Sequence, residues 1–270
     1  MYTYKRGSKM WKDNIRANVK NEFFQKLEIT PYYQPIVDVQ RRTVFGFEAL
    51  SRFKLEDMPT PPNKIFQMAS SFGLVGELDL KCRKTAIENF PLRETKLFVN
   101  VSPLYILTEE FGKRMTEKIV TELNFKKQNL VLEITDAGKV QDINIIKKTL
   151  EHYKSVGFMV GIDDVGIGYN SLYHLAELEN LVDFVKLPTE LVNGISKSDI
   201  RRKLTSMLLD IVSNIGAKLI FEGVEVEEDL DVLVWDLGAT LIQGYIVGKP
   251  MEASSVSSYV PSFRTSKKNP

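Results

Sequence analysis

The chain has 270 residues, 43% hydrophobic and 26% charged, which is the composition of a globular domain and excludes a disordered or collagen-like protein. Thirty-six basic and 35 acidic residues leave a net charge of +1, which excludes a global field that would attract nucleic acid or an anionic membrane. One cysteine and two histidines exclude a disulfide framework and a Cys/His zinc site, so any metal here requires oxygen ligands.

The first residues predict a helix rather than a targeting segment. Trp11, Ile15, Val19 and Phe23 recur every fourth residue, with lysine and arginine between them. We interpret residues 1–26 as an amphipathic N-terminal helix or extension that packs on the domain; binding to a membrane surface is the alternative. The sequence contains no signal-peptide pattern and no run of roughly 20 apolar residues, so we expect a cytoplasmic protein without membrane association.

Eight short runs, rich in β-branched and aromatic residues and bounded by turn residues, predict strands. They are 32–39, 44–50, 96–102, 129–135, 158–164, 182–187, 218–224 and 241–247. Helical patterns at 111–123, 143–156 and 200–215 lie between them, so strand and helix alternate and most strands should be parallel. This alternation predicts an α/β fold of the TIM (β/α)8 barrel type, whose typical length is about 250 residues.

The first two predicted strands form the exception. The residues between them, about 40–43, are too few for a crossover helix but enough for a hairpin, so we expect an antiparallel first strand. A doubly wound open sheet is the alternative, but the sequence has neither GxGxxG after its first strand nor a P-loop. We divide the rest into one barrel domain at 27–255, with a loop at 58–63, and a flexible C-terminal tail at 256–270.

Charged and amide side chains lie near the ends of several predicted strands. They are Glu48, Asn100, Glu133, Asp163, Asp164, Lys186, Glu222 and Glu225. One such residue alone is usually a cap or a solvated loop residue. In a barrel, however, the carboxyl ends of the strands meet at one mouth, and so many charges in apolar strands carry a desolvation cost unless a cation compensates it.

Carboxylate and amide oxygens suit Mg or Mn. At a strand end Asp163 and Asp164 can both turn toward the mouth and bridge two ions. Two ions about 3.5–4 Å apart can hydrolyse a phosphodiester, and Lys186 could orient the attacking water. The residues thus predict metal-dependent hydrolysis without identifying a substrate, and a retaining glycosidase remains an alternative.

Glu48-Ala49-Leu50, followed by Ser51-Arg52, resembles the motif that names the EAL-domain family, bacterial phosphodiesterases of the second messenger cyclic di-GMP. Further segments resemble the family in the same order along the chain, roughly from residue 30 to residue 252. These segments are YYQPIVD (32–38), FVNVSP (98–103), LEIT (132–135), IDDVGIGYNSL (162–172), VDFVK (182–186), FEGVE (221–225) and QGYIVGKP (243–250).

The resemblance implies a modified TIM barrel with an antiparallel first strand. It also implies hydrolysis of cyclic di-GMP to the linear dinucleotide pGpG, dependent on two Mg or Mn ions. The expected partners are cyclic di-GMP itself and a second copy of the chain in a homodimer, and no DNA or RNA polymer. By resemblance the metal ligands are Glu48, Asn100, Glu133 and Asp163 for the first ion and Asp163 with Asp164 for the second.

The remaining functional residues are also implied by the resemblance. Lys186 and Glu222 would position the attacking water and count, with the metal ligand Glu48, as catalytic residues. Gln34, Arg52 and Gln243 would bind the dinucleotide, Arg52 through its planar guanidinium against a phosphate oxygen.

The chain departs from the family pattern around the second ion. The family loop DDFGTG reads DDVGIG here, with Val165 and Ile167 in place of the aromatic and the hydroxyl residue. Pro188 replaces the aspartate that usually follows the lysine by two residues, and Asp136 replaces a glutamate. By the same resemblance, Asp136 and Glu225 would not bind the ions themselves but would support the loop and the residues that do.

Three readings of the function follow. The first is an active cyclic di-GMP phosphodiesterase, because all the implied ligands and the lysine are present. The second, which the altered loop favours, is a weakly active or inactive relative that serves as a cyclic di-GMP receptor or a protein-binding adaptor. The third is a barrel hydrolase with another substrate, which would have no affinity for cyclic di-GMP.

Overall fold

The computed structural model describes residues 18–102, 110–135, 143–166 and 172–266, and residues 18–25 are helical. The described strands are β1 (Leu27–Asp38), β2 (Thr43–Leu55), β3 (Met58–Thr60), β4 (Lys96–Val101), β5 (Leu130–Ile134), β6 (Met159–Ile162), β7 (Phe184–Leu187), β8 (Lys218–Phe221), β9 (Leu241–Gln243) and β10 (Met251–Glu252). The described helices and helical turns are α2 (Pro62–Ser71), α3 (Val75–Asn89), α5 (Glu110–Glu122), η1 (Lys127–Asn129), α6 (Ile143–Ser155), α7 (Leu172–Glu177), α8 (Thr189–Val192), η3 (Ile195–Lys197), α9 (Asp199–Asn214), α10 (Glu227–Asp231), η4 (Val232–Asp236) and α11 (Ala253–Val256).

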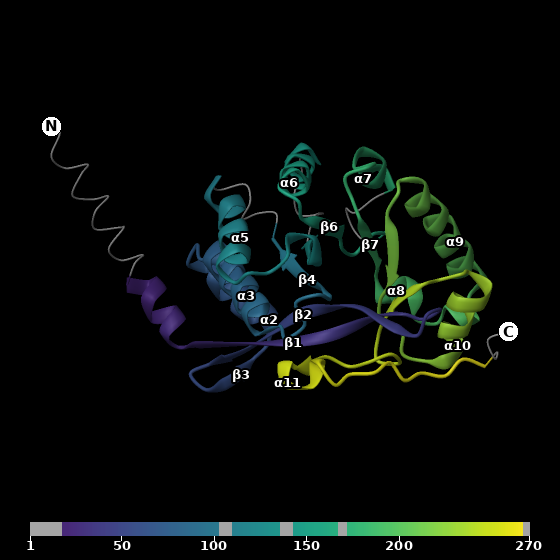
Figure 1. Ribbon diagram of the computed structural model, residues 1–270, viewed down its shortest axis with the longest axis horizontal. Coiled ribbons are helices and arrows are strands. Elements are labelled where there is room, and N and C mark those ends of the chain that lie inside the picture. Colours follow the sequence, from purple (N-terminus) through teal and green to yellow (C-terminus); the bar gives the residue numbers. More distant parts are fainter. Residues whose placement is uncertain (1–17, 103–109, 136–142, 167–171, 267–270) are drawn as a thin grey trace.

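Eight of the described strands close into a barrel. Strands β2, β4, β5, β6, β7, β8 and β9 pair in parallel, in that order. Strand β1 closes the ring because it pairs with both β2 and β9, antiparallel in each case. Figure 1 shows the long β1 and β2 strands on one side, with α5, α6, α7 and α9 outside the parallel strands. The prediction of a modified TIM barrel with an antiparallel first strand is confirmed.

The hairpin between β1 and β2 sets the register of the mouth. Asp38 ends β1, accepting a hydrogen bond from the Arg41 backbone N–H at 2.9 Å and an ion pair from its guanidinium at 2.7 Å. A register shift lies between Ile36 and Val37. Beyond it Gln34 is directly opposite Glu48. Cross-strand partners lie on the same face of a sheet, so both side chains are on the same side of the barrel wall.

The barrel interior holds its own small apolar cluster, separate from the large core between strands and helices. Its fully or nearly fully buried members are Ile36, Phe98, Val131, Phe184, Ile220 and Leu241. The rings of Phe98 and Phe184 meet edge to face, with centroids 5.1 Å apart. This cluster fills the barrel below the mouth, so the barrel is not a pore, and its members form the floor on which the side chains of the mouth lie.

Local capping chemistry positions the helices that return the chain to the mouth. Helix α9 begins after Ser198, whose hydroxyl accepts a hydrogen bond from the Arg201 backbone N–H at 3.4 Å, and Asp199 lies in its first turn. It ends at Asn214, just before Gly216, whose φ of +76° suits glycine. The chain then enters β8, which carries residues 218–221 toward Glu222.

Two short strands were not expected from the sequence. Residues 58–60, taken as part of a loop, form β3 against the end of β2, so the loop prediction was wrong there. Strand β10 pairs Glu252 with Tyr32 and Met251 with Tyr33. Elements of two or three residues are too short to show an alternating pattern, and their pairing is set by the long partner strand.

The C-terminal segment lies against the barrel as far as residue 266. Val256 and Phe263 are buried, and the Arg42 guanidinium lies 4.4 Å from the Phe263 ring centroid. These contacts concern part of the segment that we interpreted as a flexible tail; the division into extension, barrel and tail stays a prediction. No helix in the described ranges is long and apolar enough to cross a membrane.

Candidate functional site

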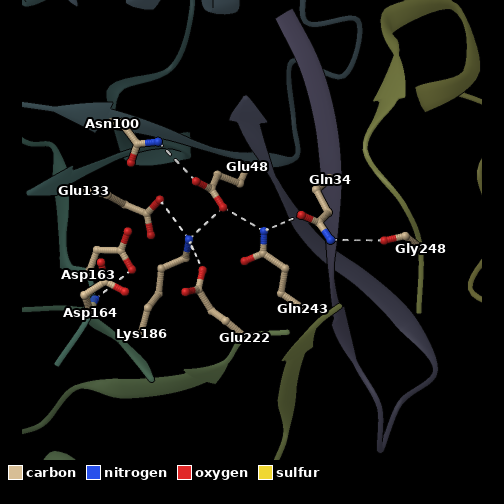
Figure 2. A network of polar contacts seen from close by, with 10 residues as sticks. All are labelled: Gln34, Glu48, Asn100, Glu133, Asp163, Asp164, Lys186, Glu222, Gln243 and Gly248. Carbon is tan, nitrogen blue, oxygen red and sulfur yellow. Dashed lines mark hydrogen bonds and ion pairs between the residues drawn. The ribbon is translucent and has the colours of Figure 1, made fainter. Parts of the chain in front are cut away.

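Each of the eight barrel strands brings one polar side chain to the mouth, either within the strand or one residue past its end. In strand order they are Gln34, Glu48, Asn100, Glu133, Asp163, Lys186, Glu222 and Gln243. Figure 2 shows these side chains converging from the surrounding strands. The predicted residues of the metal site and the lysine therefore lie together, as do two of the three predicted dinucleotide contacts.

The period of the strand explains this convergence. Six of these residues lie two positions from a member of the interior cluster, as Asn100 does from Phe98 and Glu133 from Val131. Residues two apart share a face of a strand, so the polar side chains form a layer directly above the apolar floor. On β2 and β6 the floor position is a glycine, Gly46 or Gly161, next to the bulky Phe98 and Phe184.

Lys186 lies at the centre of the layer. Its Nζ atom is 2.7 Å from Glu48 Oε2, 2.6 Å from Glu222 Oε1 and 3.4 Å from Glu133 Oε2. The lysine is 1% exposed. A buried ammonium is strongly disfavoured unless opposite charges surround it, and here three carboxylates do. These ion pairs hold the lysine in place and partly offset the repulsion among the carboxylates.

A chain of amides fixes Glu48 from its other side. Asn100 Nδ2 donates to Glu48 Oε1 at 3.2 Å, and Gln243 Nε2 donates to Glu48 Oε2 at 2.7 Å. Gln243 Nε2 also lies 3.4 Å from Gln34 Oε1, and Gln34 Nε2 donates to the Gly248 carbonyl at 3.3 Å. Figure 2 shows this chain running from Gly248 to the centre of the site. The carboxylate of Glu48 is therefore oriented by donors on three strands.

Burial and the repulsion between carboxylates shift the pKa values of the residues in this layer. Burial raises the pKa of Glu133 well above its usual value, and the neighbouring carboxylates add to that rise against the effect of Lys186. Burial likewise raises the pKa of Asp163 to about 6 and that of Glu222 to about 7. For Glu48 burial acts upward, but the charge and hydrogen bond of Lys186 hold its pKa below the usual value. Burial acts to lower the pKa of Lys186, and the surrounding carboxylates raise it well above its usual value.

Three carboxylates form a compact group at one side of the mouth. Asp163, Asp164 and Glu222 each place an oxygen within 4.8 Å of the others. Asp164 adopts φ +55°, and its backbone N–H donates to Asp163 Oδ1 at 2.8 Å. The left-handed turn, which aspartate tolerates better than most residues, breaks the strand alternation. The two adjacent side chains can therefore both face the mouth.

The donor set fits a divalent cation that prefers oxygen. Glu133 Oε1 and Asn100 Oδ1 are buried without a hydrogen-bond partner in the described chain, and Glu133 Oε2 has only its 3.4 Å ion pair with Lys186. Buried polar atoms are rarely left without a partner. A cation such as Mg or Mn would satisfy them and lower the repulsion that raises the carboxylate pKa values.

Three predicted residues do not join the network. Arg52 lies farther along β2 and is exposed; its guanidinium is 5.5 Å from the Tyr32 ring centroid and lines a cavity of about 720 Å³. Glu225 is exposed just after β8, and its side chain makes no hydrogen bond or ion pair in the described part of the chain. Asp136, like Ile167, lies outside the described residues.

The Gly248 carbonyl is a contributor that our sequence analysis missed, since a backbone acceptor carries no signature in residue type. Gly161 is another. A methyl group there would lie 3.3 Å from Glu133 Cγ, so glycine leaves the room that Glu133 occupies. A glycine two residues before Asp163 was the signal that could have indicated it.

Comparison with known proteins covers most of the chain. The family model described as EAL domain matches residues 16–250. The cyclic di-GMP phosphodiesterase PdeA of Borreliella burgdorferi is 29% identical over 87% of this chain and 35% of its own length. The probable cyclic di-GMP phosphodiesterase PdeI of Escherichia coli is 30% identical over 84% of this chain and 30% of its own length. The chain thus spans about a third of these curated relatives.

A solved structure gives a similar result. The c-di-GMP-bound crystal structure of a standalone EAL protein from Vibrio cholerae has a TM-score of 0.73 and 30% sequence identity with this chain. The match covers 84% of this chain and 94% of the other. The likeness therefore extends over the barrel as a whole.

Proposed function

The chain belongs to the EAL domain family, and from that membership we propose that it hydrolyses cyclic di-GMP to linear pGpG with the help of two Mg or Mn ions. Relatives at 29% and 30% identity are named as a phosphodiesterase and a probable phosphodiesterase of this dinucleotide, and the Vibrio cholerae protein binds it. The observation that carries the proposal is the polar layer, in which one residue from every barrel strand meets at the mouth.

The proposed reaction adds water across one phosphodiester. The water oxygen bonds to phosphorus, the bond from phosphorus to the ribose O3′ breaks, and that oxygen takes up a proton. When bound, the divalent ions would polarise the phosphoryl oxygen and lower the pKa of the water. Glu48, Asn100, Glu133 and Asp163 would hold one ion, and Asp163 with Asp164 the other.

The chain's own groups supply the rest of the chemistry. Lys186 and Glu222 would position the attacking water, as the family resemblance implies, and the ammonium of Lys186, 2.6 Å from Glu222 Oε1, would stabilise negative charge on the phosphate. The pKa of Glu222, raised by burial to about 7, suits a carboxylate that accepts and releases a proton near neutral pH. Gln34, Gln243 and Arg52 would bind the dinucleotide, and Arg52 lines a cavity of about 720 Å³ farther along β2.

The altered loop favours a second candidate, a cyclic di-GMP receptor or adaptor with weak or no turnover. Pro188 is buried and offers no side-chain ligand where the family usually has aspartate. Val165 is 1% exposed, and its backbone N–H donates to the Lys186 carbonyl at 3.2 Å. The second ion would thus have fewer supporting carboxylates than in the family pattern, while the contacts proposed for the dinucleotide remain.

We also propose that the protein acts as a homodimer in the cytoplasm. The homodimer rests on the family resemblance, and the cytoplasm is the location expected from the sequence analysis. The net charge of +1 supports recognition of a small anion by local groups over binding of a nucleic-acid polymer.

Paired calorimetry and nucleotide chromatography separate the candidates. Cyclic di-GMP is titrated into the protein with Mn²⁺, and the same sample is then analysed for pGpG. Heat of binding together with pGpG supports the phosphodiesterase, and binding without pGpG supports the receptor. Absence of both would reject cyclic di-GMP as the ligand.

A further inference from the structure

The C-terminal segment beyond residue 250 lies outside the family match, yet it approaches the site from outside the barrel. Strand β10 pairs with β1, and Figure 1 shows the segment after α11 running along that side of the molecule. Tyr259 in this segment is half-buried, and its ring meets the Phe47 ring edge to face, with centroids 6.0 Å apart. Phe47 is fully buried and immediately precedes Glu48.

The Tyr259 hydroxyl makes the second contact. It donates to the Val247 carbonyl, the residue before Gly248. Burial raises the pKa of Tyr259 to about 12, so the hydroxyl keeps its proton at neutral pH. Gly248 packs closely between Pro35 and Tyr259. A methyl group at this position would lie 2.4 Å from Pro35 Cγ and 3.1 Å from the Tyr259 hydroxyl, so there is no room for a side chain. The segment 244–248 therefore has little freedom to move on this side.

These two contacts lead to the same carboxylate. The Gly248 carbonyl accepts from Gln34, which contacts Gln243, which donates to Glu48. We propose that Tyr259 is a positioning residue for the site: through Val247 and Gly248 it orients Gln34 and Gln243, and through Phe47 it holds the backbone that carries Glu48. This inference rests on the proposed function for its kinetic part, but the placement of Glu48 is testable without turnover.

Two variants separate the contacts. Tyr259→Phe keeps the ring on Phe47 and removes the hydroxyl, so we expect the KM for cyclic di-GMP to rise several-fold while kcat changes less than about twofold. Tyr259→Leu removes both contacts, so we expect it also to weaken the affinity for Mn²⁺ by about tenfold, as loss of a group that orients a metal ligand typically does.

The matched control is Phe263→Leu. Phe263 is a buried aromatic residue of the same segment, but its ring lies against the Arg42 guanidinium, and it lines a cavity with Val234 and Trp235 of η4 that contains no residue of the polar layer. We expect Phe263→Leu to lower the Tm about as much as Tyr259→Leu while KM and Mn²⁺ affinity stay at the values of the unsubstituted chain. If Tyr259 only stabilises the fold, Tyr259→Leu and Phe263→Leu should lower the Tm to a similar extent and should not differ in KM or in Mn²⁺ affinity.

The experiment measures Tm, Mn²⁺ affinity by calorimetry, and KM with kcat in all four proteins. Equal Mn²⁺ affinity and KM in Tyr259→Leu and Phe263→Leu would overturn the inference. If the unsubstituted chain binds Mn²⁺ without forming pGpG, the proposed function fails and the Mn²⁺ affinities alone decide the role of Tyr259. Absence of Mn²⁺ binding by the unsubstituted chain would overturn both.

Discussion

At the mouth, three donors hold the carboxylate of Glu48. Lys186, Gln243 and Asn100 all donate to its carboxylate, and their combined effect keeps its pKa low, so it remains an anion in a buried setting. Hydrogen-bond donors hold this buried carboxylate in one orientation, and a carboxylate oriented in this way is suited to bind a cation.

Glu48→Ala should lower pGpG formation by at least about 100-fold, because one preorganised charge at the reacting centre is lost. The fold should persist, since Lys186 keeps its ion pairs with Glu133 and Glu222. Rates of pGpG formation and circular dichroism check this. The control is Glu94→Ala, an exposed carboxylate before β4 that is paired with Lys126. Unchanged turnover in Glu48→Ala would rule out the metal assignment.

Cys82 belongs to the fold rather than to the chemistry. Burial raises the pKa of its thiol to about 12, so at pH 8 almost all of it is protonated and unreactive. We expect a chromogenic disulfide reagent to react with native protein at pH 8 about a thousandfold more slowly than with a free cysteine, and at the ordinary rate after unfolding in urea. Rapid stoichiometric labelling of Cys82 in the native chain would contradict the raised pKa of its thiol.

Most of the site could be predicted from residue types, for a physical reason. Glu133 and Lys186 stand out because a charge inside an apolar strand is costly without a partner. Gln34 and Gln243 carry no such cost, and only the family resemblance indicated them. The Gly248 carbonyl and Tyr259 were not predicted because their contribution depends on how distant segments pack.

At the scale of elements, the strand period determines the layout of the site. The residue at a floor position lies beneath the polar side chain two positions away on the same strand, so a change at the floor should act on the site above it. Gly161 tests this, because its backbone has no positive φ that would itself restrict substitution, and Glu133 lies next to it.

Gly161→Ala should press on Glu133 and weaken Mn²⁺ affinity by about tenfold, because the added methyl group would lie 3.3 Å from Glu133 Cγ. The control is Val160→Ala on the other face of β6, a buried position in the outer core, which should lower the Tm and leave Mn²⁺ affinity unchanged. Calorimetric titration of both variants gives the answer. Full Mn²⁺ affinity in Gly161→Ala would contradict the layered arrangement.

The crowded carboxylates should destabilise the metal-free barrel as pH rises. The pKa of Glu222 in the fold, about 7, lies above its unfolded value of about 4.5, so the folded chain binds more protons between these values. Stability is then lost as pH rises through about 7. In EDTA we expect Glu222→Gln to match the unsubstituted chain in Tm near pH 5 and to exceed it near pH 8. A constant Tm difference over this range would contradict the raised pKa.

The elements could be predicted to different extents. All eight barrel strands were expected, since each is long or apolar enough to show its pattern, and the short β1–β2 connection indicated the antiparallel strand. Strands β3 and β10 could not be predicted, because strands this short derive their pairing from β2 and β1. The packing of Phe263 on Arg42 depends on a contact between residues 221 positions apart, which no local pattern encodes.

For the whole molecule, the closed barrel and the location of its charges are the properties that matter for function. The net charge is only +1, yet each of the eight barrel strands brings a buried or half-buried polar group to one mouth. The proposed binding of a doubly charged dinucleotide would therefore rely on this mouth and on Arg52, which lines a cavity farther along β2. The barrel keeps the opposing charges of the layer in fixed positions that an unfolded chain could not maintain.

We propose that the polar layer adds water to cyclic di-GMP with the help of divalent ions. The most direct test incubates the chain with cyclic di-GMP and Mn²⁺ in ¹⁸O-labelled water and analyses the products by mass spectrometry. We predict pGpG that carries one ¹⁸O atom in its terminal phosphate, and no pGpG when EDTA is present. Absence of pGpG with Mn²⁺, or formation of unlabelled pGpG, would contradict the claim.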